Sequence, residues 1–84
     1  MKVQALRNFR RNLRTALDNR GLSQREIAER VGVSYPYVNR ILTSKVAPSL
    51  PICDRFADAL KLSLAELLLS PSEFSEVDLQ AVSQ

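Results

Sequence analysis

The fold is decided by residues 23–42, which read SQREIAERVGVSYPYVNRIL. Ser23 and Glu26 form a capping box, a pattern in which each side chain accepts a hydrogen bond from the other residue's backbone N–H at a helix start. Gly32 readily takes the left-handed conformation that ends a helix. Ser34 can cap the helix that follows. The stretch therefore predicts two short helices joined by a tight turn.

Small and apolar side chains allow these two helices to cross at a steep angle. The first is expected to end near Val31 and the second to run to Leu42, and Ala28 supplies the small contact between them. The residues expected to face the core are Ile27, Ala28, Val31, Val38, Ile41 and Leu42. This geometry leaves the N-terminal end of the second helix free to enter a major groove about 12 Å wide.

Three more helices flank this pair. The first is expected from about Val3 to Asn19 and the fourth from Ser49 to about Leu60, because apolar residues recur in both at helical spacing. A second capping box, Ser63 with Glu66, predicts a short fifth helix that ends near Leu69. The residues expected to face inward are Leu6, Phe9, Leu13, Ala16 and Leu17 in the first helix and Leu50, Cys53, Phe56, Ala57 and Leu60 in the fourth.

These elements place one helix-turn-helix domain in residues 1–69. Residues 70–84 are acidic and weakly patterned, so we expect a C-terminal tail that is frayed or binds a partner. Phe74, Val77 and Ala81 could form a short apolar stripe in it, and a protein partner or a second copy of the chain could bind that stripe. Both uses stay open at this point.

The positive charge is concentrated in the first half of the chain. Residues 1–45 contain ten Lys/Arg and three Asp/Glu, whereas residues 46–84 contain two and six, within a formal net charge of +3. Such an asymmetry favours a basic face that meets a polyanion, nucleic acid first, over a merely solvated helix surface.

Several other functions are not supported by the composition. The chain has no histidine and one cysteine, Cys53, so neither an intrachain disulfide nor a Cys/His zinc site can form, and Cys53 is expected to be a small core residue. No segment has the roughly 18 apolar residues of a membrane span, and no apolar signal segment begins the chain. We therefore expect a cytoplasmic protein that is not an enzyme, with no metal, cofactor or membrane partner.

The sequence resembles the lambda-repressor/Cro-like (XRE) helix-turn-helix family from about Leu13 to Leu68. The segments that resemble it are residues 21–24, 27–28, 31–34, Val38, 40–41, 48–50 and 57–68. The resemblance implies an all-α, five-helix lambda-repressor-like DNA-binding domain with the helix-turn-helix in helices 2 and 3. It also implies double-stranded DNA as the partner, bound by a homodimer.

Residue by residue, the resemblance implies two sets of DNA contacts. The residues that would face base edges are Ser34, Tyr35, Pro36, Asn39 and Arg40. The residues that would touch phosphates are Ser23, Gln24, Tyr37, Thr43, Ser44 and Lys45. Arg40 could pair bidentately with guanine, and Asn39 could reach a base or a phosphate. Tyr37 is ambiguous, because its ring could instead pack beside the fourth helix.

Three features depart from the family pattern. Leu17 and Leu42 stand where members commonly carry an arginine and a glutamate, which predicts an apolar contact in place of a partly buried ion pair. Thr43-Ser44 replaces a frequent Asn-Gly, which makes a positive φ less accessible to the turn. Lys61 replaces a helix-ending glycine, and in the left-handed conformation it would cost on the order of 1 kcal/mol.

The leading hypothesis is a sequence-specific transcriptional regulator, a repressor that binds a palindromic operator as a homodimer. The alternative is an antitoxin-type or other protein-binding module that uses the C-terminal tail.

Overall fold

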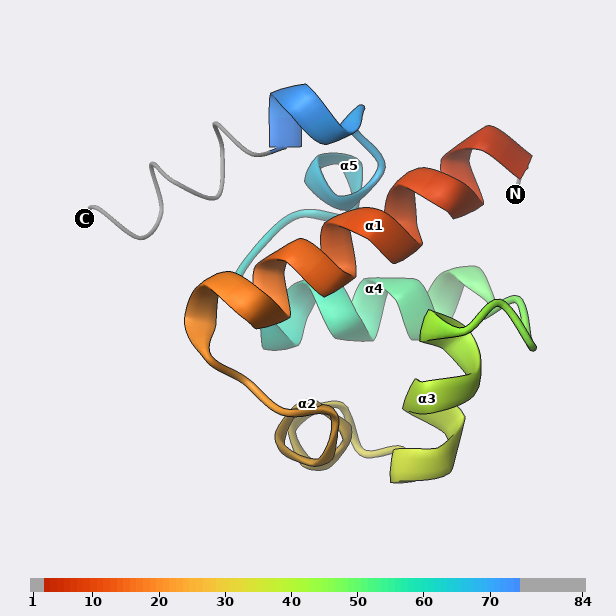
Figure 1. Cartoon of the computed structure of the whole chain (residues 1–84), viewed down its shortest axis with the longest axis vertical. Coiled ribbons are helices and arrows are strands. Elements are labelled where there is room, and N and C mark those ends of the chain that lie inside the picture. The colour runs from red at the N-terminus through yellow and green to blue at the C-terminus, as the bar shows by residue number, and fades with distance from the viewer. Residues whose placement is uncertain (1–2, 75–84) are drawn as a thin grey trace.

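The computed structural model describes residues 3–74, which are helical and contain no strand. In chain order the helices are α1 (Val3–Arg20), α2 (Gln24–Val31), α3 (Tyr35–Leu42), α4 (Leu50–Ala59) and α5 (Leu64–Leu67). Residues 71–74 add a further helical turn. Figure 1 shows α1 lying across α4, with α2 and α3 on one side of this pair and α5 on the other. The all-α, five-helix prediction is confirmed, and none of the described helices is long and apolar enough to cross a membrane.

A serine begins each of the four helices after α1. The hydroxyl oxygens of these serines accept a hydrogen bond from the backbone N–H three residues later, which satisfies one of the donors that a helix start leaves unpaired. The four capping residues are Ser23, Ser34, Ser49 and Ser63. At Ser23 the capping box is complete, because Glu26 Oε1 also accepts from Ser23 N at 3.0 Å. The predicted starts of α2, α3, α4 and α5 are therefore confirmed.

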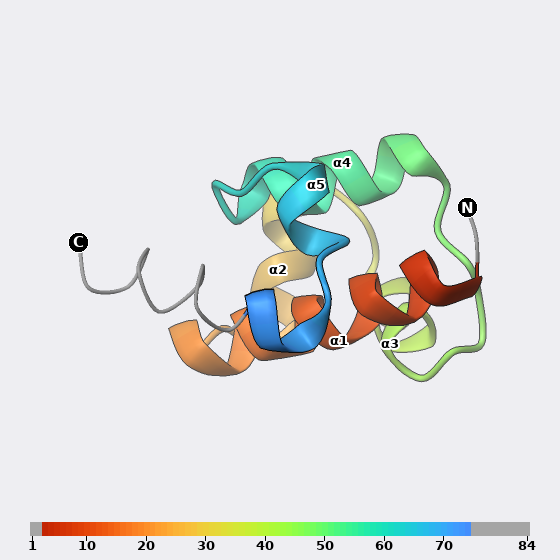
Figure 2. The same cartoon turned by 90° about the horizontal axis from the view of Figure 1, so that it is seen from above.

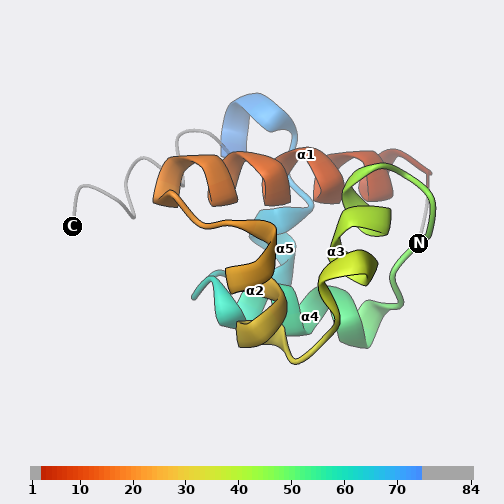
Figure 3. The ribbon, with the colours of Figure 1, turned by 60° about the horizontal axis from the view of Figure 1, so that its bottom comes forward.

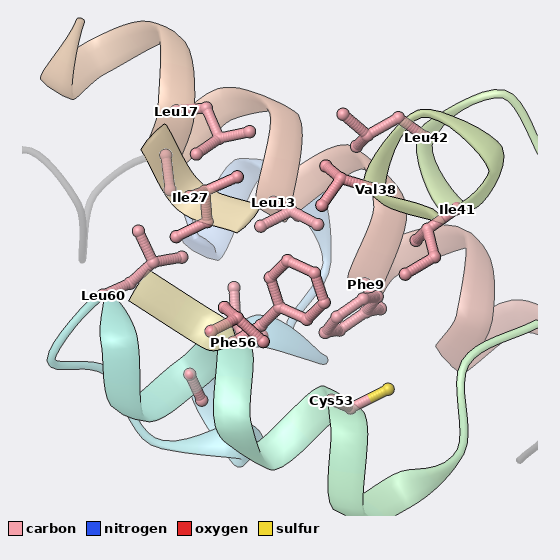
Figure 4. Close-up of a cluster of buried hydrophobic side chains, with 14 of the residues drawn as sticks. Phe9, Leu13, Leu17, Ile27, Val38, Ile41, Leu42, Cys53, Phe56 and Leu60 are labelled. Carbon is pink, nitrogen blue, oxygen red and sulfur yellow. The ribbon is translucent and has the colours of Figure 1, made fainter. Parts of the chain in front are cut away.

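The core lies where the helices meet. Phe9 of α1 and Phe56 of α4 pack edge to face, with ring centroids 6.1 Å apart and planes at 80°, a favoured aromatic arrangement. Figure 4 shows Ile27 on one side of this pair and Val38 and Ile41 of α3 on the other. Because α2 and α3 both pack into the same core, their orientation relative to α1 and α4 is fixed.

Asn12 is the buried polar residue of this core, with 1% of its side chain exposed. Its Nδ2 donates to Leu67 O and Leu69 O, each at 2.8 Å. One turn earlier, Asn8 Nδ2 donates to Leu68 O at 3.1 Å. These amides satisfy carbonyls at the C-terminal end of α5, where a helix has no internal donors left, and they fasten that end to α1.

Two predictions of burial need correction. Leu50, expected to face inward, is 53% exposed; it is the first residue of α4, and the inner face of the helix begins at Cys53. Phe74, assigned to a frayed or partner-binding tail, is fully buried in the core and its N–H donates to Ser70 O at 3.0 Å. Figure 2 shows residues 71–74 beside α1. The domain therefore extends at least to Phe74, whose ring is not available to a partner; Val77 and Ala81 lie outside the described residues.

The structure describes each of the positions that depart from the family pattern. Leu17 and Leu42 are both buried in the same apolar cluster; a direct contact between them in place of the ion pair stays a prediction. Lys61 is left-handed, with φ of 58°. Ser44 is also left-handed, with φ of 65°, so the turn after α3 takes a positive φ even without glycine.

Candidate nucleic-acid interface

The turn between α2 and α3 depends on Gly32. Its φ and ψ are 85° and 35°, a left-handed conformation that L side chains disfavour. The N–H groups of Gly32 and Val33 both donate to Ala28 O, at 2.8 and 3.0 Å, which ends α2. Arg55 of α4 donates to Val31 O at 2.6 Å and so satisfies another carbonyl of the last turn. Figure 3 shows the result, with α3 crossing beside α2 on one face of the molecule.

One face of α3 is solvent-exposed. Its buried residues are Val38, Ile41 and Leu42. The five residues predicted to face bases, Ser34, Tyr35, Pro36, Asn39 and Arg40, are all exposed. Their spacing along the helix places Tyr35 with Asn39, and Pro36 with Arg40, on neighbouring turns of the same face. The structure thus brings the predicted set together, and their contacts with bases stay a prediction.

A hydrogen bond joins the two helices on this face. Asn39 Nδ2 donates to Gln24 Oε1 at 3.2 Å. The bond leaves both hydrogens of Gln24 Nε2 and one hydrogen of Asn39 Nδ2 free to donate. It links the residue predicted to touch a phosphate to a residue predicted to reach a base, so the two groups are held in a fixed relation before any ligand arrives.

Arg25 lies beside this face and was not singled out by the sequence analysis. Its guanidinium carbon lies 4.9 Å from the ring centroid of Tyr35, within the range of a cation–π interaction. The contact restrains an exposed aromatic ring at the start of α3. A cation placed directly after Gln24 at the start of α2 is the sequence signal that could have identified it.

The residues after α3 differ in what they can donate. Thr43 N and Thr43 Oγ1 both donate to Asn39 O, at 2.9 and 2.8 Å, so a phosphate contact from Thr43 would require one of these bonds to break. Ser44 and Lys45 are exposed, and their side-chain donors have no partner among the described residues. Tyr37 is half-buried and packs against the core, in agreement with the packing alternative.

Two arginines of α1 hold the C-terminal end of α3. Arg10 donates to Ile41 O at 3.0 Å and to Val46 O at 3.3 Å, and Arg14 donates to Leu42 O at 3.1 Å. Cations suit this position, because the last carbonyls of a helix carry partial negative charge. The sequence analysis did not assign them this role. Their spacing of four residues on one face was the available signal.

Two ionisable groups depart from their ordinary behaviour. Hydrogen bonds from the backbone N–H and the side chain of Ser23 lower the pKa of Glu26, because they stabilise the carboxylate. Burial raises the pKa of the Cys53 thiol to about 11, so the thiolate is scarce near neutral pH and the side chain behaves as a small apolar residue. Among residues 3–74 no three Asp, Glu or Cys side chains are grouped so that they could hold a metal ion together.

Comparison with known proteins assigns this arrangement to a known class. Residues 13–67 match the family model HTH_3, described as a helix-turn-helix. In each of two strains of Mycobacterium tuberculosis, an uncharacterised HTH-type transcriptional regulator is 34% identical over 70 residues, which cover 77% of this chain and 50% of the relative. The chain thus spans about half the length of these relatives. The crystal structure of NHTF, a hypothetical transcription factor from Neisseria, superposes with a TM-score of 0.76 at 28% identity, covering 90% of this chain and 85% of that one.

Proposed function

Because the chain belongs to the HTH_3 helix-turn-helix family, we propose that it binds double-stranded DNA in a sequence-specific manner and regulates transcription. The observation that supports this most directly is the exposed polar face of α3. Gln24 is bonded to one of its residues and Arg10 to the carbonyls at its C-terminal end. A recognition element of this kind needs little rearrangement on binding, and that reduces the entropy cost of association.

In the proposed complex α3 lies in the major groove, and each exposed side chain contacts a base that suits its chemistry. Arg40 donates to O6 and N7 of a guanine. Asn39 uses its Oδ1 and its second Nδ2 hydrogen for an adenine, since the first hydrogen is bonded to Gln24. Tyr35 and Pro36 offer apolar contact to a thymine methyl, and the hydroxyl proton of Ser34 is free to donate because its oxygen accepts from Tyr37 N.

Phosphate contacts in the complex fix the register of the protein on the duplex. Gln24 donates through Nε2, assisted by the unpaired N–H groups at the start of α2, which attract anions. Ser23 donates through its hydroxyl, and Ser44 and Lys45 contact the strand beyond the end of α3. Thr43 and Tyr37 are the least available residues of the phosphate set. The hydroxyl of Thr43 already donates to Asn39 O, and the ring of Tyr37 packs against the core.

We further propose that the protein represses transcription as a homodimer on a palindromic operator. A single short helix reads few base pairs, whereas two copies related by a two-fold axis add their binding energies. The two half-sites would lie about 34 Å apart, one turn of DNA. A dimer bound across a promoter would exclude other proteins from the same DNA.

Selection of bound sites from a random duplex pool tests the proposal. The expected product is a palindrome with half-site centres about 10 base pairs apart. Arg40→Ala should then weaken binding by roughly 1–3 kcal/mol and relax one base position, whereas Gln24→Ala should weaken all sequences about equally. Lys61→Ala, at the turn after α4, is the matched control and should change neither the affinity nor the sequence preference. A pool without any preferred sequence, and an affinity that does not fall with added salt, would overturn the proposal.

A further inference from the structure

A hollow of about 640 Å³ lies along α1, beside the end of α3. Four arginines line it, namely Arg7, Arg10, Arg11 and Arg14, together with Ser44 and other residues, none of which is acidic. We call this hollow the α1 arginine groove. Figure 1 and Figure 3 both show the first half of α1 next to the C-terminal end of α3, so the groove adjoins the face assigned to DNA.

The arginines of the groove have no acidic partner among residues 3–74. Arg10 and Arg14 bond only to carbonyls at the end of α3 and in the loop that follows it. Arg7 and Arg11 are exposed and have no partner in the described part of the chain. Residues three and four apart on a helix repel when they carry like charge, so this spacing destabilises the isolated domain. An external anion would remove that repulsion.

The dimensions of the groove fit a polyanion better than a single phosphate. At a helical rise of about 1.5 Å per residue, Arg7 and Arg14 lie about 10 Å apart along the axis. That distance corresponds to roughly three nucleotides of one DNA strand at 3.4 Å each. The groove is also fixed relative to α3, because Arg10 and Arg14 are bonded to the carbonyls of that helix.

We propose that the α1 arginine groove is a second phosphate-binding surface, which holds one strand of the DNA that α3 reads. Arg7 and Arg11 donate to consecutive phosphates in it, and Arg10 and Arg14 keep the groove aligned with α3. This role depends on the proposed DNA binding and adds to it a backbone contact outside the helix-turn-helix. Contacts of this kind strengthen binding to any sequence, since phosphates carry no base information.

The test compares two double variants that each remove two positive charges. Arg7→Gln/Arg11→Gln alters the groove without touching Arg10 or Arg14. The matched control is Arg30→Gln/Lys61→Gln, because both of these residues are exposed and neither lines the groove. A third variant, Arg7→Lys/Arg11→Lys, keeps the charge, and the thermal midpoints of all three confirm that the domain is folded.

Affinity is measured for the selected site and for a random duplex between 50 and 200 mM salt. Loss of two phosphate contacts should reduce the slope of log K against log[salt] by about 1.8 and weaken binding to both duplexes by about one to two orders of magnitude near 0.1 M salt. Phosphate ethylation should show two or three adjacent phosphates that matter to the wild type and not to Arg7→Gln/Arg11→Gln. The lysine variant should retain the wild-type slope.

Two other outcomes separate failure of the groove proposal from failure of the proposed function. If Arg7→Gln/Arg11→Gln matches the control variant in slope and shows the wild-type ethylation pattern, the groove does not bind DNA and the helix-turn-helix alone explains the affinity. If the wild type itself has no affinity for duplex DNA, the proposed function fails.

Discussion

Replacing Gly32 with alanine tests whether the turn between α2 and α3 is held as described. The residue has φ of +85°, and an added Cβ would lie 2.8 Å from Nη2 of Arg55. That guanidinium donates to Val31 O at 2.6 Å, so it would have to withdraw from the end of α2. Gly32→Ala therefore combines backbone strain with the loss of a hydrogen bond.

The two effects have estimable sizes. An L side chain in the left-handed region costs about 1–2 kcal/mol. The alanine also reduces the entropy of the unfolded chain, which offsets roughly 0.4–1 kcal/mol of that cost. The Arg55 bond is worth on the order of 1 kcal/mol, because it joins a charged donor to a carbonyl near solvent. We expect Gly32→Ala to lower the free energy of unfolding by about 2 kcal/mol.

Gly21 is the matched control for this substitution. Its φ is +63°, but an added Cβ would meet no atom within 4 Å, so Gly21→Ala should cost only the strain, about 1 kcal/mol or less. Urea unfolding followed by circular dichroism measures both variants. In an Arg55→Ala background the difference between the two glycines should disappear. Equal losses at Gly21 and Gly32 in the wild-type background would show that the Arg55 contact contributes nothing.

Three further predictions concern two core residues and the pH dependence of the capping box at the start of α2. Phe74→Ala should lower the free energy of unfolding by about 3–5 kcal/mol, whereas Glu73→Ala should change it by less than about 0.5 kcal/mol. If both substitutions had equally small effects, residues 70–74 would not contribute to the folded domain. Asn12→Ala should lower the free energy of unfolding, measured by urea denaturation, by about 2–4 kcal/mol, because two carbonyls lose their donor. A decrease below about 1 kcal/mol would contradict this. The pKa of Glu26 is lowered in the folded state, so its stabilisation is present above the ordinary pKa of glutamate and is lost as the pH falls through the folded-state value. Thermal midpoints of wild type and Glu26→Gln should therefore converge in acid, and a gap independent of pH would refute that cause.

Much of the fold could be predicted because its signals are local. A serine before a helix, a glycine after it and apolar residues at helical spacing act within a few positions of one another, and they located the starts of α2 to α5. Phe74 could not be placed in this way, because its burial depends on packing into a core whose other members are distant in sequence. The prediction that Leu50 is buried was wrong for a related reason: at the first position of a helix the direction of a side chain depends on the preceding loop.

The candidate site was predictable to the same extent. The exposed face of α3 follows from periodicity, and all five residues expected on it are exposed. The bond between Gln24 and Asn39 could not be inferred, since it depends on the angle between two helices. Thr43 is different, because both of its donors are used by Asn39 O, four residues earlier at the end of the same helix, a local contact that threonine side chains commonly make. A polar residue in the right place is therefore an incomplete prediction until its existing partners are known.

The arginines of α1 combine an observed structural role with the proposed binding of DNA. A guanidinium has five N–H donors and keeps its charge at any accessible pH, so Arg10 can bond to Ile41 O and Val46 O and still contribute to the positive potential of the groove. Because those bonds fix its position, less conformational entropy remains to be lost when an anion binds. A lysine at this position would keep the charge but could not match the planar, fixed donor geometry. Arg10→Lys should therefore destabilise the end of α3 while leaving the net charge unchanged, so any loss of DNA affinity in that variant would measure preorganisation and not charge.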